Sequence, residues 1–361
     1  MKAAVLYEFG QPLVVEDIEV DAPKDGEIKV KLAACAICHS DIHAIEGAWG
    51  GSLPVVYGHE AAGVIDEVGT GVTRVAAGDH VVVTLIRSCG RCYHCARGDL
   101  HICESNFALN SESRLRTRSG DTVWNGIKTG AFAEYVVVDQ SQAIPVPEEV
   151  PLDSASLLAC GVITGLGAVV NTAGVEAGSS VVVIGSGGVG LNSIQGASLC
   201  GAHPIIAADL LDTKLEAARE FGATHTINLS QTEAPESLVR EYTSGRGADY
   251  VFITVGSGEA VEQGMTMTRR GGAVVVVGMP PSGVKAAFEV ESLAYDSRRI
   301  LGSNMGSARP GVDIPYLVRL YLSGRLKLDE LITARYPLQG INEAISAVKQ
   351  GKALRNVIVF K

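Results

Sequence analysis

The segment 180–190 constrains the fold of this chain more than any other. It reads SVVVIGSGGVG: a strand of β-branched residues is predicted at 181–184, the pattern G-x-G-x-x-G follows it, and a helix is predicted over 189–200. A strand that enters a helix through such a turn is typical of a parallel, doubly wound sheet. Unalternating apolar runs and amphipathic stretches then alternate, which predicts strands at 205–208, 250–255 and 273–277 and a helix at 213–221.

The glycine turn also predicts a binding site. Gly185 permits a tight turn, Gly187 lets the backbone approach a pyrophosphate, and Gly190 permits close helix–strand packing, with Gly188 between them. Asp209 ends the next apolar run at about the 20-residue spacing that the dinucleotide fingerprint requires. Its carboxylate can accept hydrogen bonds from the adenosine ribose and would repel a 2′-phosphate, so we predict NAD rather than NADP.

The two ends of the chain have a different texture. Short, partly alternating segments at 13–20, 27–34 and 62–68 are punctuated by Gly and Pro and predict a β-rich domain. After about residue 305 we predict two helices and a closing strand, at 314–323, 341–350 and 356–360.

Composition excludes several classes of partner. The 361 residues include 30 Lys+Arg against 40 Asp+Glu, a formal charge of −10, and only 5% aromatics. We therefore expect neither nucleic acid nor a membrane as a partner. Two long stretches without charged residues, on either side of Glu176, are interrupted by polar residues and Gly and are predicted to be buried. Glu8 interrupts the apolar N-terminal residues, so we expect no secretory signal and a cytoplasmic location.

Four of the eight cysteines lie within one short segment, at Cys89, Cys92, Cys95 and Cys103. In a reducing compartment, clustered thiols favour a metal over disulfides. Four thiolates in one loop favour a structural zinc ion. An iron–sulfur cluster is the alternative, although its usual run continues with a nearer fourth cysteine followed by proline, whereas Cys103 is followed by Glu104.

Three further candidate ligands are scattered along the chain. Cys38 lies in CHSDIH, His59 in GHEAAG and Cys160 in LACG. Two Cys and one His leave one tetrahedral position open, which is the pattern of a catalytic zinc ion.

Together, the G-H-E-x-x-G motif, the four-cysteine lobe, the 185–190 turn and the Cys160 segment resemble the zinc-dependent medium-chain alcohol dehydrogenases over essentially the whole chain. The resemblance implies an α/β protein of two domains. A β-rich GroES-like catalytic domain would comprise 1–161 and 305–361 and include the zinc lobe 89–103. A Rossmann NAD-binding domain would comprise 162–304.

The resemblance also implies residue roles. Cys38, His59 and Cys160 would be the catalytic zinc ligands, with Glu60 as an acidic neighbour able to approach the metal. Asp41 would orient His59, Ser40 would hydrogen-bond the alcohol, and His43 would end a proton relay. The implied cofactor contacts are Thr164 and Val189 beside the nicotinamide and Lys214 at the adenosine ribose. His39 and Arg355 would lie at the pyrophosphate, and Val277 is a further implied contact. The implied substrate pocket contains Trp49, Leu85, Met279 and Asn304.

His39 departs from the family pattern, because many relatives carry Arg there. Histidine is a weaker and titratable donor, so we expect looser NAD binding as pH rises. The segment 105–130 resembles the long insertion after the cysteine lobe that accompanies dimers in this family, so the resemblance implies a dimer rather than a tetramer.

The predicted function is hydride transfer between an alcohol and NAD, giving an aldehyde or ketone, with one catalytic and one structural Zn²⁺. Three alternatives stay open: a thiol adduct of formaldehyde as substrate, with Arg114, Arg116 and Arg118 as anion-binding groups; a polyol; or a non-catalytic dinucleotide-binding protein. A permanently bound NAD is a further possibility.

Overall fold

The structure is a computed structural model that describes Met1–Lys361 and divides into two compact units. Unit 1 comprises Met1–Cys160 and Arg309–Lys361, and unit 2 comprises Gly161–Ala308. The limits of these units lie one and four residues from the predicted domain boundaries, which follow residues 161 and 304. The reason is local: Gly161 begins helix α4 (Gly161–Gly167), and the turn η7 (Asn304–Ser307) packs against α4 within unit 2.

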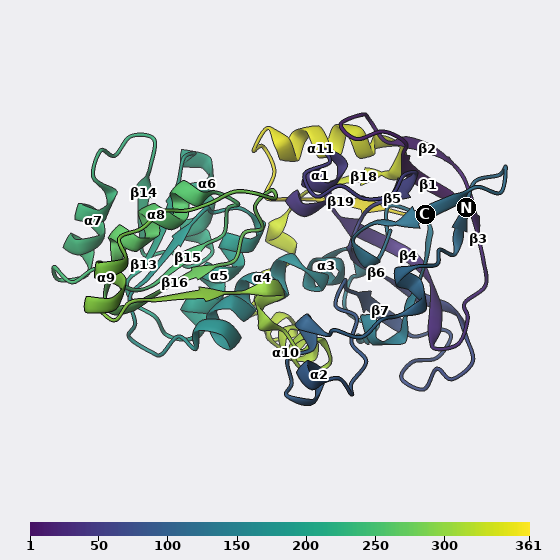
Figure 1. Ribbon diagram of the computed structural model, residues 1–361, viewed down its shortest axis with the longest axis horizontal. Coiled ribbons are helices and arrows are strands. Elements are labelled where there is room, and N and C mark those ends of the chain that lie inside the picture. Colours follow the sequence, from purple (N-terminus) through teal and green to yellow (C-terminus); the bar gives the residue numbers. More distant parts are fainter. The chain divides into compact units, whose positions relative to one another are not determined.

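Unit 1 contains two sheets (Figure 1). The first has the order β2-β1-β5-β9-β8-β3, formed by β1 (Lys2–Leu6), β2 (Val14–Asp17), β3 (Glu19–Val20), β5 (Val55–Val56), β8 (Leu115–Arg116) and β9 (Thr122–Asn125). The second has the order β11-β7-β6-β4-β19-β18, with β10 also on β4. Its strands are β4 (Glu27–Ala36), β6 (Glu60–Val68), β7 (His80–Val83), β10 (Tyr135–Asp139), β11 (Ala143–Pro145), β18 (Ile332–Pro337) and β19 (Arg355–Val359).

The two ends of the chain meet in the second sheet. Strand β19 pairs antiparallel with β4, with Val357 opposite Ala36, and β6 pairs with the other edge of β4, with Glu60 also opposite Ala36. This register explains why the C-terminal segment belongs to unit 1. The helices of unit 1 are α1 (His39–Ile45), α2 (Tyr93–Ala96), α3 (Leu152–Ser156), α10 (Pro310–Leu322) and α11 (Ile341–Lys349).

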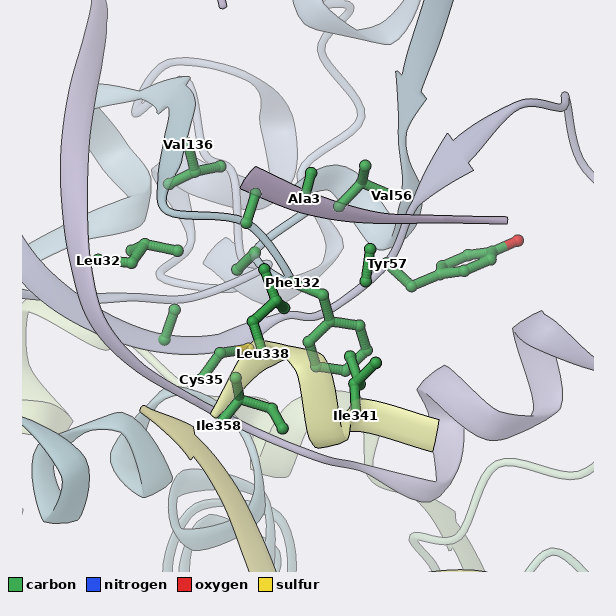
Figure 2. Close-up of a cluster of buried hydrophobic side chains, with 14 of the residues drawn as sticks. Ala3, Leu32, Cys35, Val56, Tyr57, Phe132, Val136, Leu338, Ile341 and Ile358 are labelled. Atoms are coloured by element: carbon green, nitrogen blue, oxygen red, sulfur yellow. The ribbon is translucent and has the colours of Figure 1, made fainter. Parts of the chain in front are cut away.

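The core of unit 1 draws on segments that are distant in sequence. Figure 2 shows Phe132 among Ala3 and Val56 from the first sheet, Cys35 from the second, and Ile341 from α11. Phe132 is fully buried. Burial of such an aromatic side chain contributes about 2–3 kcal/mol relative to exposure, so this cluster joins the two sheets into one unit.

Unit 2 is built on one six-stranded parallel sheet of order β14-β13-β12-β15-β16-β17. Its strands are β12 (Val181–Ile184), β13 (Ile205–Asp209), β14 (His225–Asn228), β15 (Ala248–Ile253), β16 (Thr268–Val276) and β17 (Arg299–Gly302). Its helices besides α4 are the π-helix η6 (Ala168–Ala173), α5 (Gly188–Leu199), α6 (Asp212–Glu220), α7 (Pro235–Tyr242), α8 (Gly258–Met267) and α9 (Val290–Tyr295).

Both faces of this sheet are covered. Successive strand residues point to opposite faces, yet all four residues of β12 are buried. Val182 and Ile184 join the cluster that includes Val239 of α7 and Met265 of α8. A doubly covered sheet explains the unalternating apolar runs, and the α/β fold class is confirmed. No single helix is long and apolar enough to cross a membrane, and one helix pair bent by 49°, 152–159 with 161–173, passes that test only jointly.

Candidate active site

Three predicted metal ligands converge in unit 1. Cys38 lies between β4 and α1, His59 directly precedes β6, and Cys160 precedes α4. The ligand atoms of these three residues and of Glu60 lie within 4.8 Å of one another, and all four residues are buried. The pairing of β4 with β6 brings Cys38 and His59 together, because each lies just beyond the paired strand ends. The hydroxyl of Thr84 donates to the Ala159 carbonyl at 2.7 Å and fastens the residue before Cys160.

Asp41 holds the imidazole of His59 in place. Its Oδ1 lies 2.8 Å from His59 Nδ1 and accepts from the Gly58 backbone N–H at 3.0 Å, while Oδ2 accepts from the Cys38 backbone N–H at 3.1 Å. Burial lowers the pKa of His59, but the Asp41 carboxylate outweighs burial and the net pKa is raised well above its ordinary value. Because Nδ1 is bound to Asp41, Nε2 is the nitrogen that His59 can offer to a metal.

The donor set fits a catalytic zinc ion. His59 Nε2 is buried without a hydrogen-bond partner, an arrangement that costs about 1–3 kcal/mol unless a ligand satisfies it. The hydrogen bond with Cys160 lowers the pKa of the Cys38 thiol well below its ordinary value and raises that of Cys160. Two thiolates and one imidazole are a known ligand set of catalytic zinc, which keeps a further position open.

Glu60 forms an ion pair with Arg355 beside these ligands, and both side chains are buried. Burial raises the pKa of Glu60 to about 7, although the Arg355 guanidinium opposes that shift. The sequence predicted Arg355 at the pyrophosphate, whereas the structure places its guanidinium on Glu60. No local signal could have revealed this pair, because it depends on the register in which β19 and β6 flank β4.

Helix α1 carries the predicted proton path. Ser40 and His43 are partly exposed and lie three residues apart, so they share one face of the helix, while Asp41 faces the interior. The His43 ring meets the Trp49 ring edge to face, with centroids 6.0 Å apart. His39 is exposed at the first position of α1. A hydroxyl and an imidazole on one helix face can pass a proton toward solvent.

The four cysteines of the lobe 89–103 form a second candidate metal centre in unit 1. Their sulfurs lie within 4.8 Å of one another, with 4.0 Å from Cys89 to Cys95 and 3.9 Å from Cys92 to Cys103. Zinc–sulfur bonds of about 2.3 Å in a tetrahedron separate the sulfurs by about 3.8 Å. In an iron–sulfur cluster several irons stand between the thiolates and spread them further apart. The spacing therefore fits a single zinc ion.

Backbone N–H groups point at these sulfurs. Cys89 Sγ accepts from the N–H groups of Arg91 and Cys92 at 3.4 and 3.2 Å, and Cys103 Sγ accepts from the N–H of Cys89 at 3.4 Å. A hydrogen bond from Ser105, with those from the backbone, lowers the pKa of Cys89 to about 6. These donors therefore favour the thiolate form of Cys89, which is the metal-binding form.

The glycine turn of unit 2 has the geometry that the pattern predicts. Gly185 has φ of 95°, and a Cβ on Gly190 would lie 1.8 Å from the Gly185 carbonyl oxygen, so no other residue fits at position 190. Asp209 Oδ2 accepts from the Ser186 backbone N–H at 2.6 Å, which ties the end of β13 to the turn. Ser186 Oγ is buried in the turn without a hydrogen-bond partner.

Four other residues of unit 2 were predicted to contact the cofactor: Lys214, Thr164, Val189 and Val277. Lys214 is nearly buried beside Asp209; burial lowers its pKa, and Asp209 opposes the shift. Thr164 is buried in α4 and its Oγ1 donates to Met305 Sδ at 3.6 Å. Val189 is half-buried at the start of α5, and Val277 is buried directly after β16. Their contacts with a cofactor stay a prediction.

The predicted substrate pocket stays a prediction. Trp49 and Leu85 are half-buried in unit 1, whereas Met279 and Asn304 are exposed in unit 2. The three arginines considered for anion binding are each engaged with carboxylates: Arg114 with Glu27 and Glu112, Arg116 with Asp21, and Arg118 with Asp17. Arg114 is also buried, which counts against a thiol-adduct substrate that depends on these side chains.

Two family descriptions match this chain: "Alcohol dehydrogenase GroES-like domain" over residues 24–148 and "Zinc-binding dehydrogenase" over residues 188–322. The chain is 38% identical over 368 residues to an "NDMA-dependent alcohol dehydrogenase" of Amycolatopsis methanolica, covering 99% of this chain and 98% of that protein.

Two solved structures have the same fold. The "Alcohol dehydrogenase zinc-binding domain protein" from Burkholderia ambifaria superposes with a TM-score of 0.95 at 36% identity, covering 100% of this chain and 98% of its own. The benzyl alcohol dehydrogenase from Acinetobacter calcoaceticus superposes with a TM-score of 0.93 at 32% identity, covering 100% and 99%.

Proposed function

Because this chain belongs to the zinc-dependent medium-chain alcohol dehydrogenases, we propose that it oxidises an alcohol at the Cys38–His59–Cys160 centre and passes the hydride to NAD. The observation that carries the proposal is the buried donor cluster, in which His59 Nε2 has no hydrogen-bond partner and Asp41 fixes the opposite nitrogen. A non-catalytic dinucleotide-binding protein has no need of such a cluster.

The residues of unit 1 supply binding, orientation and proton transfer. Cys38, His59 and Cys160 would hold zinc, which when bound supplies Lewis-acid stabilisation of negative charge on the substrate oxygen. Asp41 keeps the His59 ring oriented. The Ser40 hydroxyl would accept the proton of the alcohol, and His43, which lies on the same face of α1 and is partly exposed, would form the outer end of a proton relay through the nicotinamide ribose.

The choice of NAD is supported by Asp209 in unit 2. Its carboxylate stands at the carboxyl end of β13, beside the glycine turn, where a 2′-phosphate would meet a like charge. The name of the Amycolatopsis relative describes an NDMA-dependent enzyme, so the electron acceptor is the property that most needs an assay. An enzyme that keeps its NAD bound and returns the electrons to another acceptor is the second candidate.

We also propose that the chain forms a dimer. Strand β17 is an edge of the unit 2 sheet, and its Ile300 is exposed together with Val290 and Tyr295 of the neighbouring α9. Exposed edge strands with apolar side chains pair readily with another copy. Sedimentation should give a dimer, and Ile300→Lys should give monomers; a wild-type monomer would contradict this proposal.

A substrate and acceptor panel tests the function. Primary, secondary, aromatic and polyol alcohols, including benzyl alcohol, are assayed with NAD, NADP or NDMA, and absorbance of reduced nicotinamide or loss of NDMA is followed. We expect turnover with NAD well above NADP and two zinc ions per chain. Turnover with NDMA alone would support the second candidate, whereas the absence of turnover with every alcohol would refute both.

A further inference from the structure

A short turn in unit 2 holds three consecutive residues in the left-handed backbone region. Met305, Gly306 and Ser307 have φ values of 50°, 65° and 48°. This conformation suits glycine but is unfavourable for Met and Ser. Such strain persists only where the surroundings impose it, and it concentrates at functional sites. The contacts of the turn therefore show what its conformation serves.

Thr172 bridges the two ends of the turn. From the π-helix η6, its Oγ1 lies 2.9 Å from Ser303 Oγ and 2.8 Å from Ser307 Oγ. A hydroxyl has one proton to donate and two lone pairs to accept with, so Thr172 can donate to one serine and accept from the other. Single π-turns are frequent at functional sites. One side chain thus fixes residues 303 and 307 at once.

The turn also lies directly on α4. Asn171 Nδ2 donates to the Gly306 carbonyl at 3.3 Å, and a Cβ on Gly306 would lie 2.4 Å from the Ile163 carbonyl oxygen. This contact brings Met305 Sδ to 3.6 Å from Thr164 Oγ1. On its other side α4 contacts α5, where a Cβ on Gly165 would lie 2.2 Å from the Val189 carbonyl oxygen.

The sheet topology indicates which end of a dinucleotide this turn faces. In doubly wound sheets the ligand lies beyond the carboxyl ends of the strands. The glycine turn follows β12, and Asp209 marks the adenosine end at the neighbouring β13. The nicotinamide end must then extend over β15, β16 and β17, and the turn follows β17 directly.

We propose that Thr172 is a positioning residue for the nicotinamide end of the cofactor. Its hydroxyl ties Ser303 to Ser307 and so holds residues 305–307 in the left-handed conformation, which keeps Met305 against Thr164. The inference rests on the proposed function, because it requires a nicotinamide dinucleotide as ligand. It adds a residue that no motif in the sequence singles out.

The test compares two ligands that differ only at the nicotinamide end. Thr172→Val keeps the side-chain shape and removes the hydroxyl. Dissociation constants are measured by calorimetry for NADH and for ADP-ribose, which has the adenosine and pyrophosphate but no nicotinamide. We expect NADH binding to weaken about tenfold, as for the loss of one to two hydrogen bonds, and ADP-ribose binding to change less than about twofold. Thr172→Ser should restore the wild-type ratio.

Thr243→Val is the matched control. The Thr243 hydroxyl is equally engaged in unit 2, donating to Val239 O at 2.6 Å and accepting from the Gly247 N–H at 2.9 Å, but it lies at the end of α7. This variant should lower the melting temperature and leave the ratio of the two dissociation constants unchanged.

Two variants of Ser307 distinguish the effect of the Thr172 hydrogen bonds on the turn from an effect on overall stability. Ser307→Gly and Ser307→Ala both remove the hydroxyl that bonds Thr172, but glycine relieves the left-handed backbone strain whereas alanine keeps it. We expect Ser307→Ala to weaken NADH binding more than Ser307→Gly, and Thr172→Val to speed amide exchange at residues 303–307 without ligand.

Equal weakening of NADH and ADP-ribose in Thr172→Val, or no weakening of either, would overturn the inference while leaving the proposed function intact. A wild-type chain that binds neither ligand would overturn both.

Discussion

Among single residues, a few polar side chains hold the ligands of the buried metal site in place, and Asp41 is the clearest of them. Asp41 accepts three hydrogen bonds while fully buried, and two of its partners are the ligand His59 and the backbone of the ligand Cys38. A buried carboxylate with this many donors fixes the position of whatever it touches. We therefore expect Asp41 to affect metal affinity without touching the metal.

Replacement of Asp41 by Asn tests this role. The amide can accept fewer of the three hydrogen bonds, so the His59 ring is less firmly held, and zinc affinity at this centre should fall about 10–100-fold. Competition with a chelator, followed by metal analysis, measures the loss. The zinc of the four-cysteine lobe should stay bound, and loss of both ions together would mean that Asp41 only supports the fold.

A second prediction for a single residue concerns Asp209 and the preference for NAD over NADP. Asp209→Gly removes the negative charge that would repel a 2′-phosphate, so the preference for NAD over NADP should narrow by about tenfold or more. Because Asp209 also holds the Ser186 N–H, NAD binding itself should weaken. Fluorescence titration with both reduced cofactors measures the two effects, and an unchanged preference would contradict the assignment.

At the scale of elements, the four-cysteine lobe should behave as a separate metal-dependent loop. Removal of one ligand with Cys103→Ala should release one zinc ion per chain and open residues 89–103 to proteases, because the only helices of this segment are the four-residue α2 and a three-residue 3-10 turn at Leu100–Ile102. Cys200→Ala, which removes a thiol outside both clusters, is the control. Proteolysis of both variants at equal rates would refute the lobe as a metal-stabilised element.

The hydrogen bonds of Asp249 in β15 predict that the free energy of unfolding depends on pH. Burial raises the pKa of Asp249, but hydrogen bonds from Ser180 and Arg269 outweigh it and the net pKa is lowered below its ordinary value of 3.8. A carboxylate with a lowered folded pKa stabilises the fold above its unfolded pKa, and this stabilisation is lost as pH falls through the folded pKa. Asp249→Asn should therefore cost about 1–2 kcal/mol near pH 7 and much less near pH 3, as urea unfolding would show. An equal cost at both values would contradict the assignment.

The elements were predictable where periodicity alone defines them. The strand predicted at 181–184 and the helix at 189–200 appear as β12 and as α5, shifted by one residue. The π-helix η6 and the turn η7 could not be predicted, because their conformations depend on the Thr172 bridge and the close approach of Gly306 to α4. Local propensity disfavours three left-handed residues in succession.

For the whole molecule, the sequence identified the candidate metal ligands but not the ion pair that lies beside them. The ligand set of both metal centres could be proposed from residue types, because zinc accepts few kinds of ligand. The Glu60–Arg355 pair could not, because it joins strands that are adjacent only through the order β6-β4-β19. The same topology explains why a discontinuous unit 1 forms one compact body.

Whether alcohol turnover depends on zinc at the Cys38–His59–Cys160 cluster is measured by the zinc content and turnover of Cys38→Ala beside Cys200→Ala. We predict that Cys38→Ala keeps the fold and the lobe zinc, contains one zinc ion fewer per chain, and loses turnover on the order of 10³-fold or more. Undiminished turnover in Cys38→Ala with one zinc ion per chain would contradict the account, because the chemistry would then not depend on the buried centre.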